Sequence, residues 1–202
     1  MSIVTLVSGG LDSMVLAVLA AESNVQQFPL FVNYGQIFYE REYESCVSAL
    51  KRLGLPVPRR MSVPGFGRAI PCGLTSRKKH IVKDAFLPNR NLLFLVCGAA
   101  YAHSTGANAV AIGLLTEETH LFHDQTQDFL NSAEITLRKS LGREIHVVAP
   151  LMRFNKADVV ALAEEKGIKK WYSCHSGKKR PCGHCISCRE YSLKEQGAKN
   201  GG

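Results

Sequence analysis

The sequence predicts an α/β fold: an open, mostly parallel sheet flanked by helices, with a small C-terminal zinc-binding segment. Two observations predict it. Short apolar segments alternate with segments of helical periodicity along residues 1–170, and four closely spaced cysteines follow them. With 202 residues, 46% of them apolar, the chain can bury one sizeable core. We therefore expect a main domain over 1–170, a four-cysteine segment over 171–195 and a flexible tail over 196–202.

The strands and helices are expected in alternation. Each strand is a short apolar run, and each helix repeats apolar residues at helical spacing until a glycine such as Gly54 or Gly106. Asn155 is expected to cap the last helix, with Asp158 three residues later in a capping-box-like position. Residues 64–88, rich in Gly, Pro and charge, predict a loop or flap. The expected strands span 3–7, 29–34, 56–63, 108–113 and 144–150, and the helices 11–21, 40–53, 91–106, 124–139 and 155–167.

Three residues follow the ends of predicted strands. In parallel folds of this kind, ligands gather at the carboxyl ends of the strands. Ser8, Tyr34 and Gly113 would fall there. We therefore expect these residues to lie around a common site at one edge of the sheet.

Positive charge is concentrated in two segments. Residues 51–90 carry ten Lys and Arg residues against Asp84 alone, and residues 151–202 carry eleven against five acids, in a chain of net charge +8. A solvated loop explains the first segment, and a surface for phosphates, nucleic acid or an acidic partner is the alternative. Because there is no regular basic stripe with interleaved aromatic residues, the solvated loop is favoured over nucleic-acid binding.

We expect a cytoplasmic protein. The chain has no apolar run of about 18 residues, and its start, MSIVTLVSGG, lacks the basic region and cleavage site of a signal peptide. In a reducing compartment the seven cysteines stay reduced, and close spacing then indicates a metal site rather than disulfides.

The string SGGLDS, residues 8–13, has the features of an anion-binding loop. Gly9 and Gly10 let backbone amides approach an anion closely, and the following helix offers free N–H groups and the positive end of its dipole. Asp12 is the exception, because a carboxylate repels phosphate. The residues alone explain it as a first-turn acid that stabilises the helix.

Four cysteines near the C-terminus follow the pattern C-x7-C-x2-C-x2-C, with Gly183 allowing a tight turn. Four thiolates at such short spacings fit a tetrahedral structural Zn²⁺ site. His175 and His184 are alternatives for a fourth ligand, and an iron–sulfur cluster or free thiols are alternatives to zinc. The expected ligands are Cys174, Cys182, Cys185 and Cys188.

The string SGGLDS after an N-terminal strand resembles the pyrophosphate (PP) loop of the ATP-pyrophosphatase superfamily, whose members split ATP into AMP and pyrophosphate. Together with the cysteine pattern, it makes the chain similar to the 7-cyano-7-deazaguanine synthase family over nearly its whole length. The further motifs that carry this resemblance are NYGQ (33–36), LPNRN (87–91), AIG (111–113), APL (149–151) and NKADVV (155–160).

The resemblance implies an adenine nucleotide alpha hydrolase-like fold and an ATP-dependent carbon–nitrogen ligase. Such an enzyme adenylates 7-carboxy-7-deazaguanine, amidates it with ammonia, and dehydrates the amide to the nitrile after a second adenylation. Positioning and charge neutralisation are then the main tasks of the protein. ATP, Mg²⁺ and Zn²⁺ are the implied cofactors, and a homodimer would suit the resemblance.

The resemblance also implies roles for individual residues. The expected catalytic residues are Asp12, Ser13, Arg90 and Lys156, although ordinary salt bridging is the alternative for the two cations. The expected ATP-binding residues are Leu6, Val7, Ser8, Gly9, Gly10, Leu11, Asp12, Ser13, Tyr34, Gln36 and Gly113, and the expected substrate-binding residues are Arg90, Asn91, His123 and Asp124. For Asn91, a helix cap or a first-turn position is the alternative.

The chain departs from the family pattern at two places. Asn33 stands where the family commonly has aspartate, and the stretch 120–129 lacks the usual proline, cysteine and arginine. Asp124 is retained there and could accept hydrogen bonds from a purine-like amidine edge. His120 and His123 are new polar groups, either surface histidines or ligand-binding residues.

Two other functions stay open. A specialised relative, of the kind attached to anti-phage defence or DNA modification, would stop at the amide or pass the deazaguanine to a protein or nucleic-acid partner. The altered stretch 120–129 and the basic segment 51–90 motivate that alternative. A degenerate nucleotide-binding module is the other alternative, and the intact loop at 8–13 argues against it.

Overall fold

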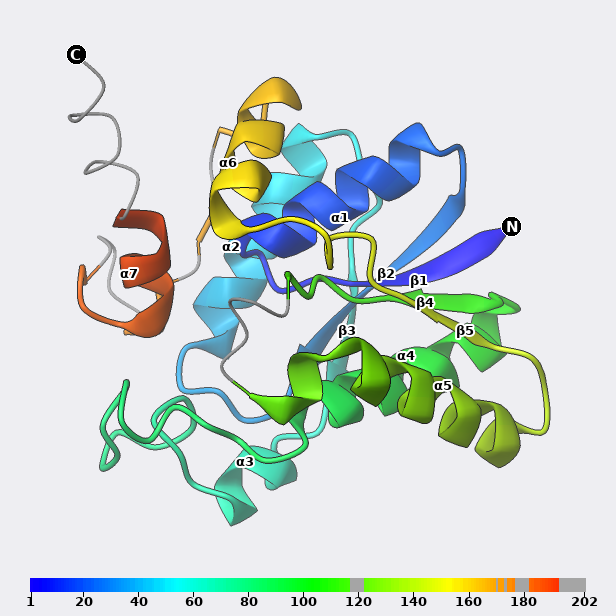
Figure 1. The fold of residues 1–202 in the computed structure, drawn as a ribbon. Helices are drawn as coiled ribbons and strands as arrows, with labels where there is room; N and C mark the ends of the chain where they lie inside the picture. Colours follow the sequence, from blue (N-terminus) through cyan, green and yellow to red (C-terminus); the bar gives the residue numbers. More distant parts are fainter. Residues whose placement is uncertain (117–121, 170, 173, 177–181, 193–202) are drawn as a thin grey trace.

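The structure is a computed structural model that describes residues 1–116, 122–169, 171–172, 174–176 and 182–192. Its centre is a five-stranded sheet in which all neighbouring strands are parallel, in the order β3-β2-β1-β4-β5 (Figure 1). The predicted mostly parallel sheet is therefore confirmed. The strands are β1 (Ser2–Leu6), β2 (Gln26–Asn33), β3 (Arg59–Ser62), β4 (Ala109–Ala111) and β5 (His146–Val148).

Helices cover both faces of the sheet, as the alternating pattern predicts (Figure 1). Helices α1, α2 and α6 contribute to the core on one face, and α4 and α5 contribute to the core on the other. No helix in the described part of the chain is long and apolar enough to cross a bilayer. The helices are α1 (Leu11–Glu22), α2 (Tyr39–Arg52), α3 (Gly65–Ala69), α4 (Arg90–Thr105), α5 (Gln127–Leu141), α6 (Lys156–Glu165) and α7 (Ile186–Ser192).

Several segments differ from the expected boundaries, and β4 and β5 are shorter than the strands expected there. The predicted strand at 56–63 is shortened to β3, and α7 forms where no helix was expected. The predicted helix at 124–139 is divided into a 3-10 turn, η2 (His123–Gln125), and α5. The division falls at Thr126, whose extended backbone ends the turn and whose hydroxyl accepts the Phe129 N–H to cap α5.

The segment predicted as a loop or flap at 64–88 contains the short helix α3 and has a buried side. Cys72, Leu74 and Leu87 are buried and pack with Tyr34, which follows β2. The apolar residues in this basic segment thus cover the end of β2, while its charged side chains remain on the surface.

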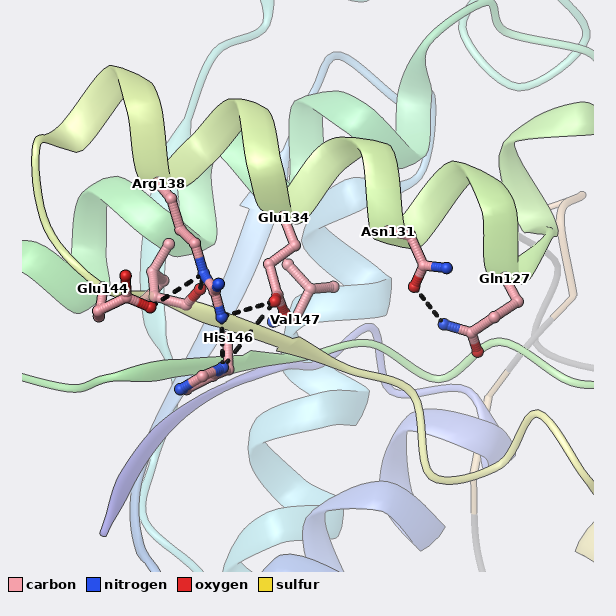
Figure 2. Close-up of polar contacts among 8 residues, drawn as sticks. Gln127, Asn131, Glu134, Arg138, Glu144, His146 and Val147 are labelled. Carbon is pink, nitrogen blue, oxygen red and sulfur yellow. Dashed lines mark hydrogen bonds and ion pairs between the residues drawn. The ribbon is translucent and has the colours of Figure 1, made fainter.

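Strand β5 forms one edge of the sheet, and side chains of α5 bind its free side (Figure 2). Glu134 accepts the Val147 N–H at 2.6 Å, and the Arg138 Nε donates to the Ile145 carbonyl at 3.0 Å. Arg138 also pairs with Glu134 at 2.7 Å. An edge strand normally exposes unpaired backbone groups, and these contacts satisfy two of them.

Candidate active site

A cavity of about 780 Å³ opens at the carboxyl ends of β1, β2 and β4. The chain runs outward from β1 through β2 to β3 and then returns to form β4 on the other side of β1, so the strand order reverses at β1. Ligands of open parallel sheets bind at such a reversal. The first turns of α1, α4 and α6 and the cysteine segment also line the cavity.

Two serine hydroxyls fix the conformation of the loop at residues 8–10. The Ser13 hydroxyl donates to the Gly10 carbonyl at 2.9 Å and accepts the Ser8 N–H at 3.1 Å. The Ser8 hydroxyl accepts the Gly10 N–H at 3.3 Å. No side chain caps α1, whose N-cap is Gly10, so this helix start presents its amides to the cavity.

Gly9 is required at its position for two reasons. Its φ is +84°, which L side chains rarely adopt, and a Cβ there would lie 3.0 Å from the Glu42 carbonyl oxygen. Gly113 lies beside Asp12, since a Cβ built on Gly113 would be 3.4 Å from the Asp12 carbonyl carbon. The predicted strand-end residues Ser8, Tyr34 and Gly113 therefore all line one cavity.

Asp12 and Lys156 form an ion pair at the mouth of the loop. The Lys156 Nζ donates to the two carboxylate oxygens of Asp12 at 3.1 and 2.9 Å. Lys156 is the first residue of α6, and the predicted cap of that helix is confirmed: the Asn155 side chain accepts the Asp158 N–H at 3.0 Å, and Asp158 accepts the Asn155 N–H at 2.8 Å. This capping box fixes the start of the helix that supplies the lysine.

The turn NYGQ after β2 is held by its own side chains. Asn33 accepts the Gly35 N–H at 3.0 Å, and Gly35 has a φ of +98°. The Gln36 Oε1 accepts the Tyr34 N–H at 2.9 Å, and its Nε2 donates to Glu42 at 3.2 Å. Gln36, predicted to bind ATP, thus lines the cavity while its amide groups organise the turn.

Arg90, Tyr34 and Glu42 form a polar cluster in the cavity. Burial raises the pKa of the Tyr34 hydroxyl, and the adjacent Arg90 charge lowers it in part. Burial also raises the pKa of the Glu42 carboxyl, while the Gln36 hydrogen bond and the Arg90 charge lower it in part. Sequence reasoning missed Glu42, because it is one of three closely spaced glutamates on α2.

The predicted substrate-binding residues do not all line the cavity. Asn91 is buried and lines the cavity, and its Nδ2 donates to the Asp124 carbonyl at 2.9 Å. The Asp124 carboxylate accepts the Asn91 N–H at 3.2 Å. Asn91 is the second residue of α4 and so lies in its first turn. His123 is exposed and is not among the residues that line the cavity. His120 lies outside the described residues.

The four predicted cysteine ligands come together. Their sulfur atoms lie within 4.8 Å of one another, and none forms a disulfide. Burial raises the pKa of the Cys182 thiol, but hydrogen bonds from the N–H groups of His184 and Cys185 lower it, and the result is a pKa of about 6. Among the described residues, no histidine joins this group. The arrangement could hold a metal ion, since ligands of a tetrahedral zinc with bonds of about 2.3 Å are separated by roughly 3.8 Å.

The cysteine segment also forms part of the cavity wall. Its Tyr172 N–H donates to the Gly9 carbonyl at 3.1 Å, which joins the segment to the loop. His175, considered in the sequence only as a fourth metal ligand, lines the cavity instead. Its Nδ1 is buried and has no hydrogen-bond partner among the described residues. Burial, with a smaller contribution from the nearby Arg90 charge, lowers the pKa of His175 to about 4.

Comparison with known proteins identifies related sequences along the whole chain. The family model for queuosine biosynthesis protein QueC matches residues 2–198. A 7-cyano-7-deazaguanine synthase 1 from Desulfitobacterium hafniense is 32% identical over 200 residues, covering 93% of this chain and 88% of the relative. A 7-cyano-7-deazaguanine synthase from Bdellovibrio bacteriovorus is 31% identical over 208 residues, covering 92% and 89%.

Solved structures with low sequence identity share the fold. NMN synthetase from Francisella tularensis aligns with a TM-score of 0.56 at 15% identity, covering 96% of this chain and 77% of that one. The U34-tRNA thiolase NcsA from Methanococcus maripaludis, with its [4Fe-4S] cluster, aligns with a TM-score of 0.54 at 18% identity, covering 99% and 67%. These similarities support the predicted α/β fold.

Proposed function

This chain belongs to the QueC family of queuosine biosynthesis proteins, and on that premise we propose that it converts 7-carboxy-7-deazaguanine into 7-cyano-7-deazaguanine with ATP and ammonia. The observation that carries this proposal is the cavity in which the SGGLDS loop, the Asp12–Lys156 pair and Arg90 meet. Relatives named as 7-cyano-7-deazaguanine synthases align over most of their length. The enzyme is accordingly an ATP-dependent ligase of the PP-loop type.

The loop and the start of α1 bind the β- and γ-phosphates in this proposal. Backbone amides of an uncapped helix start bind an anion well, and Ser8 and Ser13 hold the loop in shape. Four residues at the strand ends or in the first turn of α1 support the nucleotide: Leu6, Val7, Leu11 and Gly113. Lys156 neutralises charge that develops on the phosphates.

Two metals complete the proposed site. Asp12 would hold Mg²⁺, which would supply further charge neutralisation for the phosphates, and Lys156 would then contact a phosphate oxygen in place of the carboxylate. Zn²⁺ held by the four cysteines would fix the segment that carries His175. A four-iron cluster holds each cysteine on a separate iron and so spaces the sulfurs more widely than a single ion does, which favours one zinc ion.

The chemistry proceeds through two adenylations. A carboxylate oxygen of the acid attacks the α-phosphorus of ATP, and pyrophosphate leaves. Ammonia then adds to the acyl carbon, loses a proton, and displaces AMP to give the amide. The amide oxygen attacks the α-phosphorus of a second ATP, and pyrophosphate leaves. Loss of both protons from nitrogen with departure of AMP then gives the nitrile. The protein's part is to align the acid with the α-phosphorus and to neutralise the leaving pyrophosphate.

A second candidate differs only after adenylation. The stretch 120–129 departs from the family pattern, and Asp124 is engaged with Asn91. A changed substrate stretch is compatible with an enzyme that stops at the amide or transfers the deazaguanine to an amine on a protein or nucleic acid.

Product mass analysis distinguishes these functions. Purified metal-replete enzyme is incubated with ATP, Mg²⁺ and 7-carboxy-7-deazaguanine, with and without ammonia. The proposal predicts pyrophosphate in both reactions, because adenylation precedes the ammonia step, and AMP and the nitrile only with ammonia. Amide as the final product, or a deazaguanine mass added to a macromolecular partner, supports the second candidate. If folded, metal-replete enzyme forms no AMP that depends on the acid, both functions are ruled out.

A further inference from the structure

Glu42 occupies a position that the proposed chemistry does not use. It lies in the first turn of α2, and its carbonyl oxygen would be 3.0 Å from a Cβ on Gly9. The side chain lines the cavity together with Gln36 and Arg90. A carboxylate has therefore been placed beside the phosphate loop, at the end of β2, where it would repel phosphate.

The orientation of Gln36 fixes how this carboxylate is presented. The Gln36 Oε1 is occupied by the Tyr34 N–H at 2.9 Å, so its Nε2 must serve as donor toward Glu42 Oε2, at 3.2 Å. Glu42 is thereby held by one donor and retains further lone pairs that face the cavity. A reversed amide would place two acceptors together and lose both contacts.

In the described part of the chain, no cation forms an ion pair with Glu42. Arg90 is nevertheless close enough to affect its carboxylate electrostatically. A partly buried carboxylate with one hydrogen bond is costly without further donors. A ligand that brings N–H groups would supply them.

We propose that Glu42 accepts hydrogen bonds from the ring N–H and the 2-amino group of the deazaguanine acid, and so selects this heterocycle. This inference rests on the proposed function for the identity of the substrate. A guanine-type ring presents two adjacent N–H donors, which match the two oxygens of a carboxylate. Adenine has no such pair of donors, so the same carboxylate disfavours the base of ATP at this position.

Arg90 and Glu42 give the cavity complementary charges for one substrate. Arg90 lies near Glu42, Tyr34 and His175, and all four residues line the cavity. The acid carries a carboxylate at one end and the donor pair on the opposite part of its ring system. The cation attracts the carboxylate and Glu42 binds the donors, which orients the molecule.

The test compares two ligands in three proteins. The dissociation constants of 7-carboxy-7-deazaguanine and of its analogue without the 2-amino group are measured by calorimetry, in the presence of α,β-methylene-ATP. The proteins are wild type, Glu42→Gln and, as matched control, Glu44→Gln, since Glu44 is an exposed glutamate on the same helix. Wild type and Glu44→Gln should prefer the amino compound by about 5- to 150-fold, the range for a bidentate contact, and Glu42→Gln should lose most of that preference.

Equal affinity of wild type for the two ligands overturns the proposal, whether or not Glu42→Gln folds. An undiminished preference in folded Glu42→Gln overturns it as well. AMP formation is measured separately on wild type. If the preference depends on Glu42 but the acid supports no AMP formation, the recognition role stands and the proposed reaction fails.

Discussion

Lys156 and Asp12, 144 residues apart in sequence, form a two-pronged contact in which one ammonium reaches both oxygens of one carboxylate at 3.1 and 2.9 Å. The pair explains why an anion-binding loop contains an acid. Lys156 cancels the charge of Asp12, and a bound divalent cation would take over that task when phosphates are present. The two residues thus form one electrostatic unit at the loop.

Replacing either member of this pair should abolish most of the activation chemistry. Lys156→Met should lower kcat/KM for AMP formation by about 100-fold or more, because a preorganised charge beside the phosphates is lost. Asp12→Asn should lower it comparably and weaken the dependence of the rate on Mg²⁺. Lys166→Met removes a surface lysine paired with Glu22 and should leave the rate unchanged. Wild-type rates in folded Lys156→Met would contradict the role of the pair.

Gly9→Ala should disrupt ATP binding more than its single methyl group suggests. The new Cβ would approach the Glu42 carbonyl at 3.0 Å and the Cys46 N at 3.1 Å, on a backbone with φ of +84°. We expect the affinity for ATP, measured by calorimetry, to fall about fivefold or more, since the strain costs about 1 kcal/mol or more. Gly142→Ala is the control, because it has a similar φ of +64° and open space. Unchanged ATP affinity in Gly9→Ala would show that the loop tolerates a different path.

His175 should contribute to binding of the acid rather than of the metal. Its buried Nδ1 lacks a partner among the described residues, and a ligand that supplies one gains about a tenfold affinity. His175→Leu should therefore raise KM for the acid about tenfold, with KM for ATP and metal content unchanged. His175→Asn, which keeps a polar atom near the Nδ1 position, should restore part of the loss.

His184→Leu is the matched control for this prediction. His184 is exposed, and its Nδ1 bonds the Cys182 carbonyl at 2.8 Å, outside the cavity lining. Its replacement should leave both KM values near those of wild type. Loss of bound metal from His175→Leu would instead assign His175 to the metal site.

Removal of the metal should loosen the cavity wall together with the cysteine segment. Cys185→Ser removes one of four clustered thiols, and the Tyr172 N–H bond to Gly9 connects that segment to the phosphate loop. We expect a wild-type content of one zinc per chain, and faster amide hydrogen exchange at 172–176 and 8–10 in the variant. Cys97→Ser, a cysteine on α4 remote from the cluster, should retain the metal. Exchange in the loop that does not respond to metal loss would refute the connection.

The sheet, the phosphate loop and the cysteine cluster could be predicted because each has a local signal. Apolar runs that alternate with helical periodicity define the strands and helices, and the Asn155–Asp158 box lies within four residues. The boundary between η2 and α5 could not be placed, because it depends on how the backbone turns at Thr126.

The cavity wall could be predicted only in part, because its partners are distant in sequence. Glu40, Glu42 and Glu44 are equivalent in the sequence, and only the packing of α2 against Gly9 brings Glu42 to the cavity. Asp124 was predicted from its position in a motif to bind substrate, whereas its contact with Asn91 across 33 residues has no sequence signal.

The central claim is that a carboxylate oxygen of the substrate attacks the α-phosphorus of ATP. It is tested most directly with 7-carboxy-7-deazaguanine labelled with ¹⁸O in both carboxylate oxygens. The masses of AMP, pyrophosphate and the deazaguanine product are then measured after turnover with ammonia. The account predicts one ¹⁸O in each AMP, none in pyrophosphate and a nitrile without oxygen from the carboxylate. Unlabelled AMP, or release of ADP with labelled phosphate, would contradict it.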